Sequence, residues 1–372
     1  MAGIYFHIPF CKQACHYCNF HFSTNLTRRN EMINIMVREI ELRKDFFNKG
    51  EQIATIYFGG GTPSITDQDG LGQLLEAVHK NFKVADYPEI TLEANPDDLD
   101  RHKLKTFVDL GINRLSIGIQ SFHDTELRMM NRVHNAQMAV SSVALSQEMG
   151  ISNITIDLIF GVQNSTEASW LENLNQAIKL EVPHMSCYNL TVEPKTALAH
   201  FVKVGKVDPV DDDLSARQFG MTMDVLGDAG YEHYEISNYT RPGFISQHNS
   251  NYWRGIPYLG IGPSAHSYDG HQRLWNVSNN ALYLKSLAKD TLPISSEELS
   301  LTEQCNEYLM TRLRTKWGVD FESLSNFQPD IDWEDRASTF TDQGLLYIEN
   351  QKFFLTREGK FYADQISSEL FV

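Results

Sequence analysis

Short apolar runs rich in β-branched residues alternate with amphipathic helical segments through the first half of the chain. Six runs predict strands, at residues 4–8, 55–58, 90–93, 114–119, 153–160 and 184–190. Three helix-to-strand junctions look alike, and each sets a glycine where a helix C-cap needs a positive φ, at Gly111, Gly150 and Gly230. Their likeness predicts repeated parallel units rather than a mixed sheet. We therefore predict an α/β fold, a partial (β/α)6 barrel whose site lies at the carboxyl ends of the strands.

The pattern changes after about residue 205, where a polar connector precedes an amphipathic helix at residues 214–230. Residues 237–270 are rich in aromatic residues, glycine and asparagine, and they are too long for an ordinary connection, so we expect a functional loop. Beyond residue 295, a helix, a hairpin around Asn350 and a closing helix predict a small winged-helix-like α+β domain.

The pattern thus divides the chain into three parts. They are a partial barrel with a cysteine motif at residues 1–235, a connecting segment at residues 236–295 and the C-terminal domain at residues 296–372.

The composition of the chain limits which kinds of partner it can bind. The net charge is −16, from 32 basic against 48 acidic residues, so we expect no nucleic-acid partner. No signal sequence and no uncharged apolar stretch of about 18 residues occurs, so we expect a cytoplasmic protein, with peripheral membrane contact left open.

Three of the five cysteines lie together as C-x3-C-x2-C, at Cys11, Cys15 and Cys18, directly after the first predicted strand. The remote Cys187 and Cys305 are expected to be small buried residues, and the whole set fits a reduced compartment. Three thiolates on one loop can hold three irons of a cubane and leave the fourth iron open to a small ligand.

A structural zinc site is the alternative interpretation of these three thiols. It would be completed by His7, His16 or His21, which lie close in the sequence. The C-x3-C-x2-C spacing is not a usual zinc pairing, and the position of the motif at the mouth of the predicted barrel also favours the cubane.

Five motifs occur in order along the chain, the first of which ends on Cys11: "YFHIPFC", "YFGGGTPS", "LEANPDDL", "SIGIQSF" and "DLIFG". With C-x3-C-x2-C after a first strand, they resemble the coproporphyrinogen dehydrogenase-like branch of the radical S-adenosylmethionine (SAM) enzymes. The resemblance runs over nearly the whole chain. It implies a partial barrel of radical SAM type with a 4Fe-4S cluster, which binds SAM and cleaves it reductively to a 5′-deoxyadenosyl radical.

Polar and glycine residues at the predicted strand ends have a physical interpretation of their own. The glycines after the second strand would let a backbone approach a ligand closely, although a flexible turn explains them equally well. Glu93 is the only acid in "ITLEANP", where it would face the barrel mouth unless it caps a helix or pairs with a base. Gln120 and Asp157 are polar residues within apolar runs, as inward-facing ligands would be.

The resemblance assigns roles to these positions. It implies that the methionine end of SAM meets Gly60, Gly61 and Thr62, and that Glu93 meets its ribose or amino group. It also makes Arg132 a partner of the SAM carboxylate, where a helix-face charge is the alternative. Tyr5 and Tyr17 match positions beside the cluster and the adenosine, with barrel-core or loop packing as their alternative.

Two departures separate the chain from the dehydrogenases of this branch. Those enzymes carry a further cysteine two residues after the third, where this chain has Phe20, and they place an extension before the first strand. Both departures point to the sister group, the HemW-type haem chaperones. "HNSNYW" at His248 to Trp253 matches the H-N-x-x-Y-W motif of that group.

Histidine is a common haem ligand, so His248 is the first candidate to bind haem iron and His266 the second. There are two alternatives to haem ligation by His248. Its ring could be merely hydrogen-bonded, or its motif could form a lid over the SAM pocket. The sequence therefore predicts a haem chaperone, monomeric or homodimeric, that passes haem to an unidentified acceptor protein. An oxygen-independent coproporphyrinogen III dehydrogenase, or another radical SAM tetrapyrrole oxidoreductase, is the second hypothesis. A zinc-stabilised α/β protein is the third.

Overall fold

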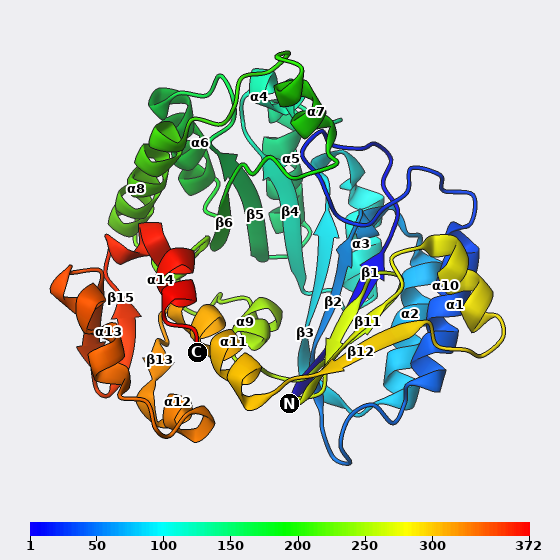
Figure 1. Ribbon diagram of the computed structural model, residues 1–372. Coiled ribbons are helices and arrows are strands. Elements are labelled where there is room, and N and C mark those ends of the chain that lie inside the picture. Colours follow the sequence, from blue (N-terminus) through cyan, green and yellow to red (C-terminus); the bar gives the residue numbers. More distant parts are fainter.

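The computed structural model describes residues 1–372, in which a curved twelve-stranded sheet is followed by a small module with a three-stranded sheet (Figure 1). Six neighbouring strands at the centre of the large sheet are parallel. They are β1 (Ala2–Ile8), β2 (Ile53–Gly60), β3 (Val84–Ala94), β4 (Arg114–Gln120), β5 (Asn153–Phe160) and β6 (His184–Asn189). The predicted six-stranded parallel unit is confirmed.

Helices alternate with these strands. They are α1 (Arg29–Leu42), α2 (Gln68–Asn81), α3 (Arg101–Asp109), α4 (Asp124–Met129), α5 (Ala136–Glu148), α6 (Glu167–Lys179), α7 (Ala197–Lys203) and α8 (Asp212–Asp228), with short 3-10 turns at Pro63–Ile65 and Pro96–Asp98. Figure 1 shows α1, α2, α6 and α8 on the outer side of the curved sheet. Alternate strand residues such as Ile4 and Phe6 are fully buried in the core on that side, so their neighbours Tyr5 and His7 face the inside of the barrel.

The sheet as a whole is mixed, so the prediction of a purely parallel sheet is wrong. At one edge, β9 (Tyr258–Ile261) runs parallel to β1, and β10 (His266–Tyr268), β11 (Gln272–Asn276) and β12 (Ile294–Glu298) continue antiparallel. At the other edge, β8 (Asn238–Thr240) lies antiparallel between β6 and β7 (Glu232–Glu235).

The three similar junctions still have the predicted backbone. Gly111, Gly150 and Gly230 have φ values of 81°, 91° and 82°. The third junction leads into β7, which does not pair with β6. The chain turns back after β7 in a hairpin, which needs no crossover helix, and the returning strand β8 pairs with β6.

Residues 237–270 do not form the expected long loop. They contain β8, α9 (Gln247–Trp253), β9 and β10. Figure 1 shows α9 inside the curve of the sheet, where it contacts β1 and β2. The Glu89 carboxylate accepts hydrogen bonds from the first two backbone N–H groups of α9, on Gln247 and His248, at 3.0 and 2.9 Å. The segment therefore plugs the barrel from within.

The remaining helix of the large sheet is α10 (Asn280–Leu287), and the small module follows. It comprises α11 (Leu301–Leu313), β13 (Val319–Asp320), α12 (Phe321–Phe327), α13 (Trp333–Asp342), β14 (Leu346–Glu349), β15 (Lys352–Leu355), a 3-10 turn (Gly359–Tyr362) and α14 (Ala363–Glu369). Asn350 and Gln351 both adopt left-handed φ, at 50° and 61°, which confirms the predicted hairpin turn. The module has its own core of 14 buried residues. No helix of the protein combines the length and the apolar character needed to span a membrane.

Candidate functional site

The carboxyl ends of the central strands surround a cavity of ≈ 430 Å³. Most of the residues singled out from the sequence line it, namely Cys11, Cys15, Tyr17, Cys18, Gly60, Gly61, Thr62, Glu93, Gln120, Arg132 and Asp157. Tyr5 and His248 do not. The topology thus brings together side chains from five strands and from the loop between β1 and α1, as expected for a barrel of this type.

The cysteine loop is tied down on both sides. The backbone N–H of Cys11 donates to the carbonyl of Ser23 at 3.1 Å, which closes the base of the loop. The Thr62 hydroxyl donates to the Cys11 sulfur at 3.4 Å, and the Arg132 guanidinium donates to the Cys15 sulfur at 3.3 Å. Burial raises the pKa of Cys11 to about 11 and also raises the pKa of Cys18, so an incoming metal must displace protons there.

The donor set fits an iron–sulfur cluster better than a zinc ion. All three thiols are free, and no three histidine, cysteine or acidic side chains converge as the ligands of one metal ion. Of the imidazoles that zinc would need, His7 bonds the carbonyl of His21, His16 bonds the carbonyl of Met129, and His21 bonds Asn280. In a cubane each thiolate binds a different iron, so the ligands need not meet at a point.

The glycines after β2 are required by a close approach of two backbones. Gly60 has a φ of 108°, and a Cβ on Gly61 would lie 2.5 Å from the carbonyl oxygen of Phe10. The N–H groups of Gly61 and Thr62 donate to the carbonyls of Ile8 and Phe10, at 2.8 and 2.7 Å. The segment therefore holds the cysteine loop against the end of β2, a role that the sequence interpretation did not include.

Two carboxyl groups face the cavity without a basic partner in hydrogen-bond contact. The Tyr57 hydroxyl donates to Glu93 at 2.9 Å, and the Ser116 hydroxyl donates to Asp157 at 3.3 Å. Burial raises the pKa of Glu93 to about 7 and that of Asp157 to about 6. Glu93 neither caps a helix nor forms an ion pair, so the alternative of a capping or salt-bridged carboxylate is excluded. A cationic ligand in the cavity would be stabilised by both carboxylates.

Arg132 lies in the turn after α4, with its guanidinium in the cavity wall. It donates to the Asn95 side-chain oxygen at 2.5 Å and to the Gly118 carbonyl at 2.6 Å, besides its contact with Cys15. A merely exposed helix-face charge is therefore excluded. Its contact with a SAM carboxylate stays a prediction, because protein groups take these three bonds.

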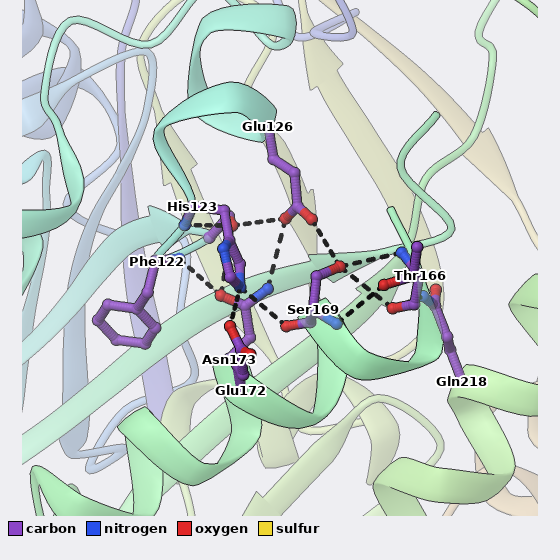
Figure 2. Close-up of polar contacts among 9 residues, drawn as sticks. Phe122, His123, Glu126, Thr166, Ser169, Glu172, Asn173 and Gln218 are labelled. Carbon is purple, nitrogen blue, oxygen red and sulfur yellow. Dashed lines mark hydrogen bonds and ion pairs between the residues drawn. The ribbon is translucent and has the colours of Figure 1, made fainter. Parts of the chain in front are cut away.

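Gln120 ends β4 in the left-handed region, with a φ of 69° next to a register shift. The chain that follows is anchored to α6 through the polar contacts of Figure 2. The Phe122 N–H donates to Asn173 at 2.6 Å, and the hydroxyls of Ser121 and Ser169 donate to the Glu126 carboxylate at 2.5 and 3.0 Å. Backbone strain at a ligand-facing residue persists where surrounding contacts hold it, as they do here.

Sequence reasoning missed four cavity or supporting residues: Tyr57, Asn95, Ser116 and Tyr188. Asn95 bridges Arg132 and Thr62, and the signal for it was its place directly after β3, within a quoted motif. Ser116 lies four residues before Gln120 on β4, so the period of two would have found it, whereas no predicted residue on β2 or β6 pointed in the same way to Tyr57 or Tyr188.

Tyr5 and His248 lie deeper in the barrel. The Tyr5 hydroxyl contacts Nδ1 of His7 at 3.2 Å, and its ring packs 6.0 Å from that of Tyr57. His248 is 2% exposed, with Nδ1 at 2.8 Å from the Thr55 hydroxyl and Nε2 at 2.9 Å from the Tyr252 hydroxyl. Burial lowers the pKa of His248 to about 3.

These contacts contradict the expectation that His248 ligates haem, because both ring nitrogens are already bonded and solvent does not reach them. The alternative of a lid over the SAM pocket fails as well. The ring lies beside Gly3 and Thr55, in the half of the barrel that holds the amino-terminal ends of β1 and β2.

Comparison with known proteins agrees with this architecture. The family model described as "Radical SAM superfamily" matches residues 5–177, and the one described as "HemN C-terminal domain" matches residues 299–362. The solved structure of coproporphyrinogen III oxidase (HemN) from Escherichia coli superimposes with a TM-score of 0.86 over 100% of this chain and 90% of that one, at 20% identity. The fold is that of a radical SAM protein.

Full-length relatives define the family more closely. The chain is 32% identical to the heme chaperone HemW of Bacillus subtilis, over 98% of both chains. It is 34% identical to the heme chaperone HemW of Synechocystis, over 100% of this chain and 96% of the relative. The chain belongs to the HemW family within the radical SAM superfamily. This membership implies a 4Fe-4S cluster and SAM, and the three thiols and the adjoining cavity fit both.

Proposed function

We propose that this protein is a haem chaperone that binds haem and passes it to acceptor proteins while carrying a SAM-binding 4Fe-4S cluster. The observation that carries the proposal is the similarity to proteins named heme chaperone HemW, which spans 98% of both chains at 32% identity. The likeness to HemN, at 20% identity, supports the shared fold only.

The residues around the first cavity have definite parts in this proposal. When bound, the cluster supplies an iron with an open position for the amino and carboxylate groups of SAM. Cys11, Cys15 and Cys18 would hold it, and the Arg132 guanidinium positions the Cys15 sulfur through its hydrogen bond. Glu93 and Asp157 present carboxyl groups whose charge suits the sulfonium and amino groups of SAM.

Phe20 supports haem handling over porphyrinogen oxidation. It stands where the dehydrogenases of this branch have another cysteine, and it is 67% exposed at the edge of the cavity. A phenyl ring can neither ligate iron nor carry a proton, but it can stack on a flat macrocycle. The acceptor is a protein of unidentified structure. The proposal also includes that the protein is a monomer or a homodimer, that it is cytoplasmic, and that it can contact a membrane peripherally.

The test uses the full chain, reconstituted anaerobically with iron and sulfide. Haem is titrated in with and without SAM, and transfer is followed to apomyoglobin as a spectroscopically distinct acceptor. Conversion of coproporphyrinogen III is assayed in parallel with SAM and dithionite. We expect stoichiometric haem binding, transfer to the acceptor and no porphyrinogen turnover.

A matched pair of cysteine variants controls the cluster. Cys15→Ser should lose the iron–sulfur absorbance and SAM binding, whereas Cys305→Ala, in the core of the small module, should keep both. Turnover of coproporphyrinogen III by the wild-type protein would contradict the proposal, and so would failure to bind haem.

A further inference from the structure

A second cavity, of ≈ 390 Å³, lies on the other side of the cysteine loop. Its lining residues are Tyr5, His7, Asn19, Phe20, His21, Tyr252, Tyr258, Ser264 and His266. Asn19 and Phe20 line the first cavity as well, so the two spaces share one wall. A ligand in the second cavity would therefore lie directly beside the cluster loop and the SAM site.

Three imidazoles line this second cavity, but only one has both nitrogens free. His7 uses Nε2 on the His21 carbonyl at 2.8 Å and Nδ1 on the Tyr5 hydroxyl at 3.2 Å. His21 uses Nε2 on the Asn280 side chain at 2.7 Å. His266 is exposed and makes no hydrogen bond within the chain.

The His266 ring is nevertheless oriented. It stacks on the ring of Trp275, its partner across the β10–β11 pair, with centroids 6.2 Å apart and planes at 27°. Partial burial and the nearby charge of Arg273 lower its pKa, which favours the neutral imidazole with a lone pair for a metal.

The other walls are aromatic. Tyr252 and Tyr258 meet edge to face, with centroids 4.5 Å apart, and Phe20 exposes a large apolar ring at the wall shared with the first cavity. The Arg273 guanidinium lies near His266 and Tyr258, but it already pairs with the carboxylates of Glu297, at 3.7 Å, and Glu307. One free imidazole and several aromatic faces match an iron and a flat macrocycle.

We propose that haem binds in this second cavity, with His266 as the protein ligand of the iron and Phe20 against the macrocycle. The inference rests on the proposed haem-chaperone function and names the site that the function lacks. The cavity is open and of ordinary ligand size, so it would hold one edge and face of haem and leave the rest accessible to an acceptor.

The site also gives the H-N-x-x-Y-W motif a different role. His248 is a positioning residue, because its Nε2 holds the Tyr252 hydroxyl at 2.9 Å and Tyr252 lines the cavity. The motif thus reaches haem through its tyrosine, from the face of α9 that carries Tyr252.

The test compares histidine variants of the reconstituted full-length protein by haem titration, Soret absorbance and electron paramagnetic resonance of ferric haem. His266→Ala should weaken haem binding at least tenfold and remove the histidine-ligated signature, and free imidazole should restore the signature. His271→Ala is the matched control, since His271 is exposed on the same β-hairpin but lies outside the cavity. Iron content and SAM binding should be the same in all three proteins. Phe20→Ala should weaken haem binding with the signature retained.

The outcomes separate the two proposals. If wild type binds haem and His266→Ala keeps both the affinity and the signature, the second-cavity site is overturned while the chaperone function stands. Loss of the signature in His21→Ala or His248→Ala, but not in His266→Ala, would overturn it too. If wild type binds no haem, the proposed function itself fails.

Discussion

Glu93 and Asp157 show how burial sets the chemistry of single residues in this site. Both face the first cavity, both are hydrogen-bonded to hydroxyl groups, and neither has a basic partner in contact. Burial disfavours the charged form, and it raises the pKa of Glu93 from 4.5 to about 7. At neutral pH this carboxyl group is therefore partly protonated, and a cationic ligand beside it would favour the ionised form.

The stability of the cluster-free protein should report this pKa. Between about pH 4.5 and pH 7 native Glu93 keeps a proton that the unfolded chain has released, so stability falls as pH rises through this window. The glutamine of Glu93→Gln cannot titrate. Between pH 5 and pH 8 the free energy of unfolding of this variant should therefore fall by on the order of 2 kcal/mol less than that of wild type. Urea unfolding at several pH values measures the difference. Glu148→Gln, a change at an exposed carboxylate, should follow wild type, and equal slopes for wild type and Glu93→Gln would refute the argument.

At the scale of elements, the segment after β4 depends on α6. Asn173 is fully buried, and its side-chain oxygen accepts hydrogen bonds from the Phe122 N–H at 2.6 Å and the Ser121 hydroxyl at 3.3 Å (Figure 2). These bonds hold the chain next to Gln120, whose backbone is strained. The end of β4, which points a side chain into the cavity, is thus fixed by α6, the fourth element after it along the chain.

Asn173→Ala should destabilise the protein by roughly 2 kcal/mol, because it leaves buried donors without acceptors. It should also weaken SAM binding, since Gln120 loses its support. Chemical unfolding and calorimetric titration of the reconstituted protein measure the two effects. Glu172→Ala, on the same helix, is the control: its side chain is 71% exposed, so its stability should stay within about 0.5 kcal/mol of wild type. A wild-type stability for Asn173→Ala would show that the contacts of Figure 2 are dispensable.

At the scale of the whole molecule, the small module docks on the β7 edge of the large sheet. The Ile236 N–H donates to the carbonyl of Arg314, and the Lys316 N–H donates to the carbonyl of Tyr234, at 3.1 and 2.9 Å. The Arg314 guanidinium pairs at 3.3 Å with Glu235, which is 2% exposed. The guanidinium of Arg254, just after α9, lies 4.2 Å from the ring centroid of Trp317. The plug of the barrel and the module are therefore linked.

Arg314→Ala should destabilise the protein by roughly 2 to 4 kcal/mol, because it removes the basic partner of a buried carboxylate. Unfolding followed by tryptophan fluorescence, with Trp253 and Trp317 near the junction, reports the effect. Lys316→Ala breaks the more exposed pair with Glu232 and should cost at most about 1 kcal/mol. Equal small effects for both variants would mean that the junction contributes little to stability.

Local patterns in the sequence determined much of this protein. Apolar runs predicted the six central strands, glycines at helix ends predicted the left-handed caps, and the spacing of three cysteines predicted one loop that carries all three thiols. Eleven predicted residues line one cavity because parallel strands end at the same edge of a sheet, whatever their exact packing. These features depend on period and on local backbone preference, which a sequence carries directly.

Only the tertiary structure decided what lies next to what at long range. It turned residues 237–270 from a loop into an internal plug, because Glu89 caps α9 from a strand about 158 residues away in the chain. Both ring nitrogens of His248 are hydrogen-bonded, to Thr55 and Tyr252, so neither is available to a haem iron. The His266 ring has no hydrogen-bond partner in the chain, and it lines the second cavity together with Phe20. Whether a histidine is a ligand or a structural residue depends on its partners and its exposure, and neither is written in the residues on either side of it.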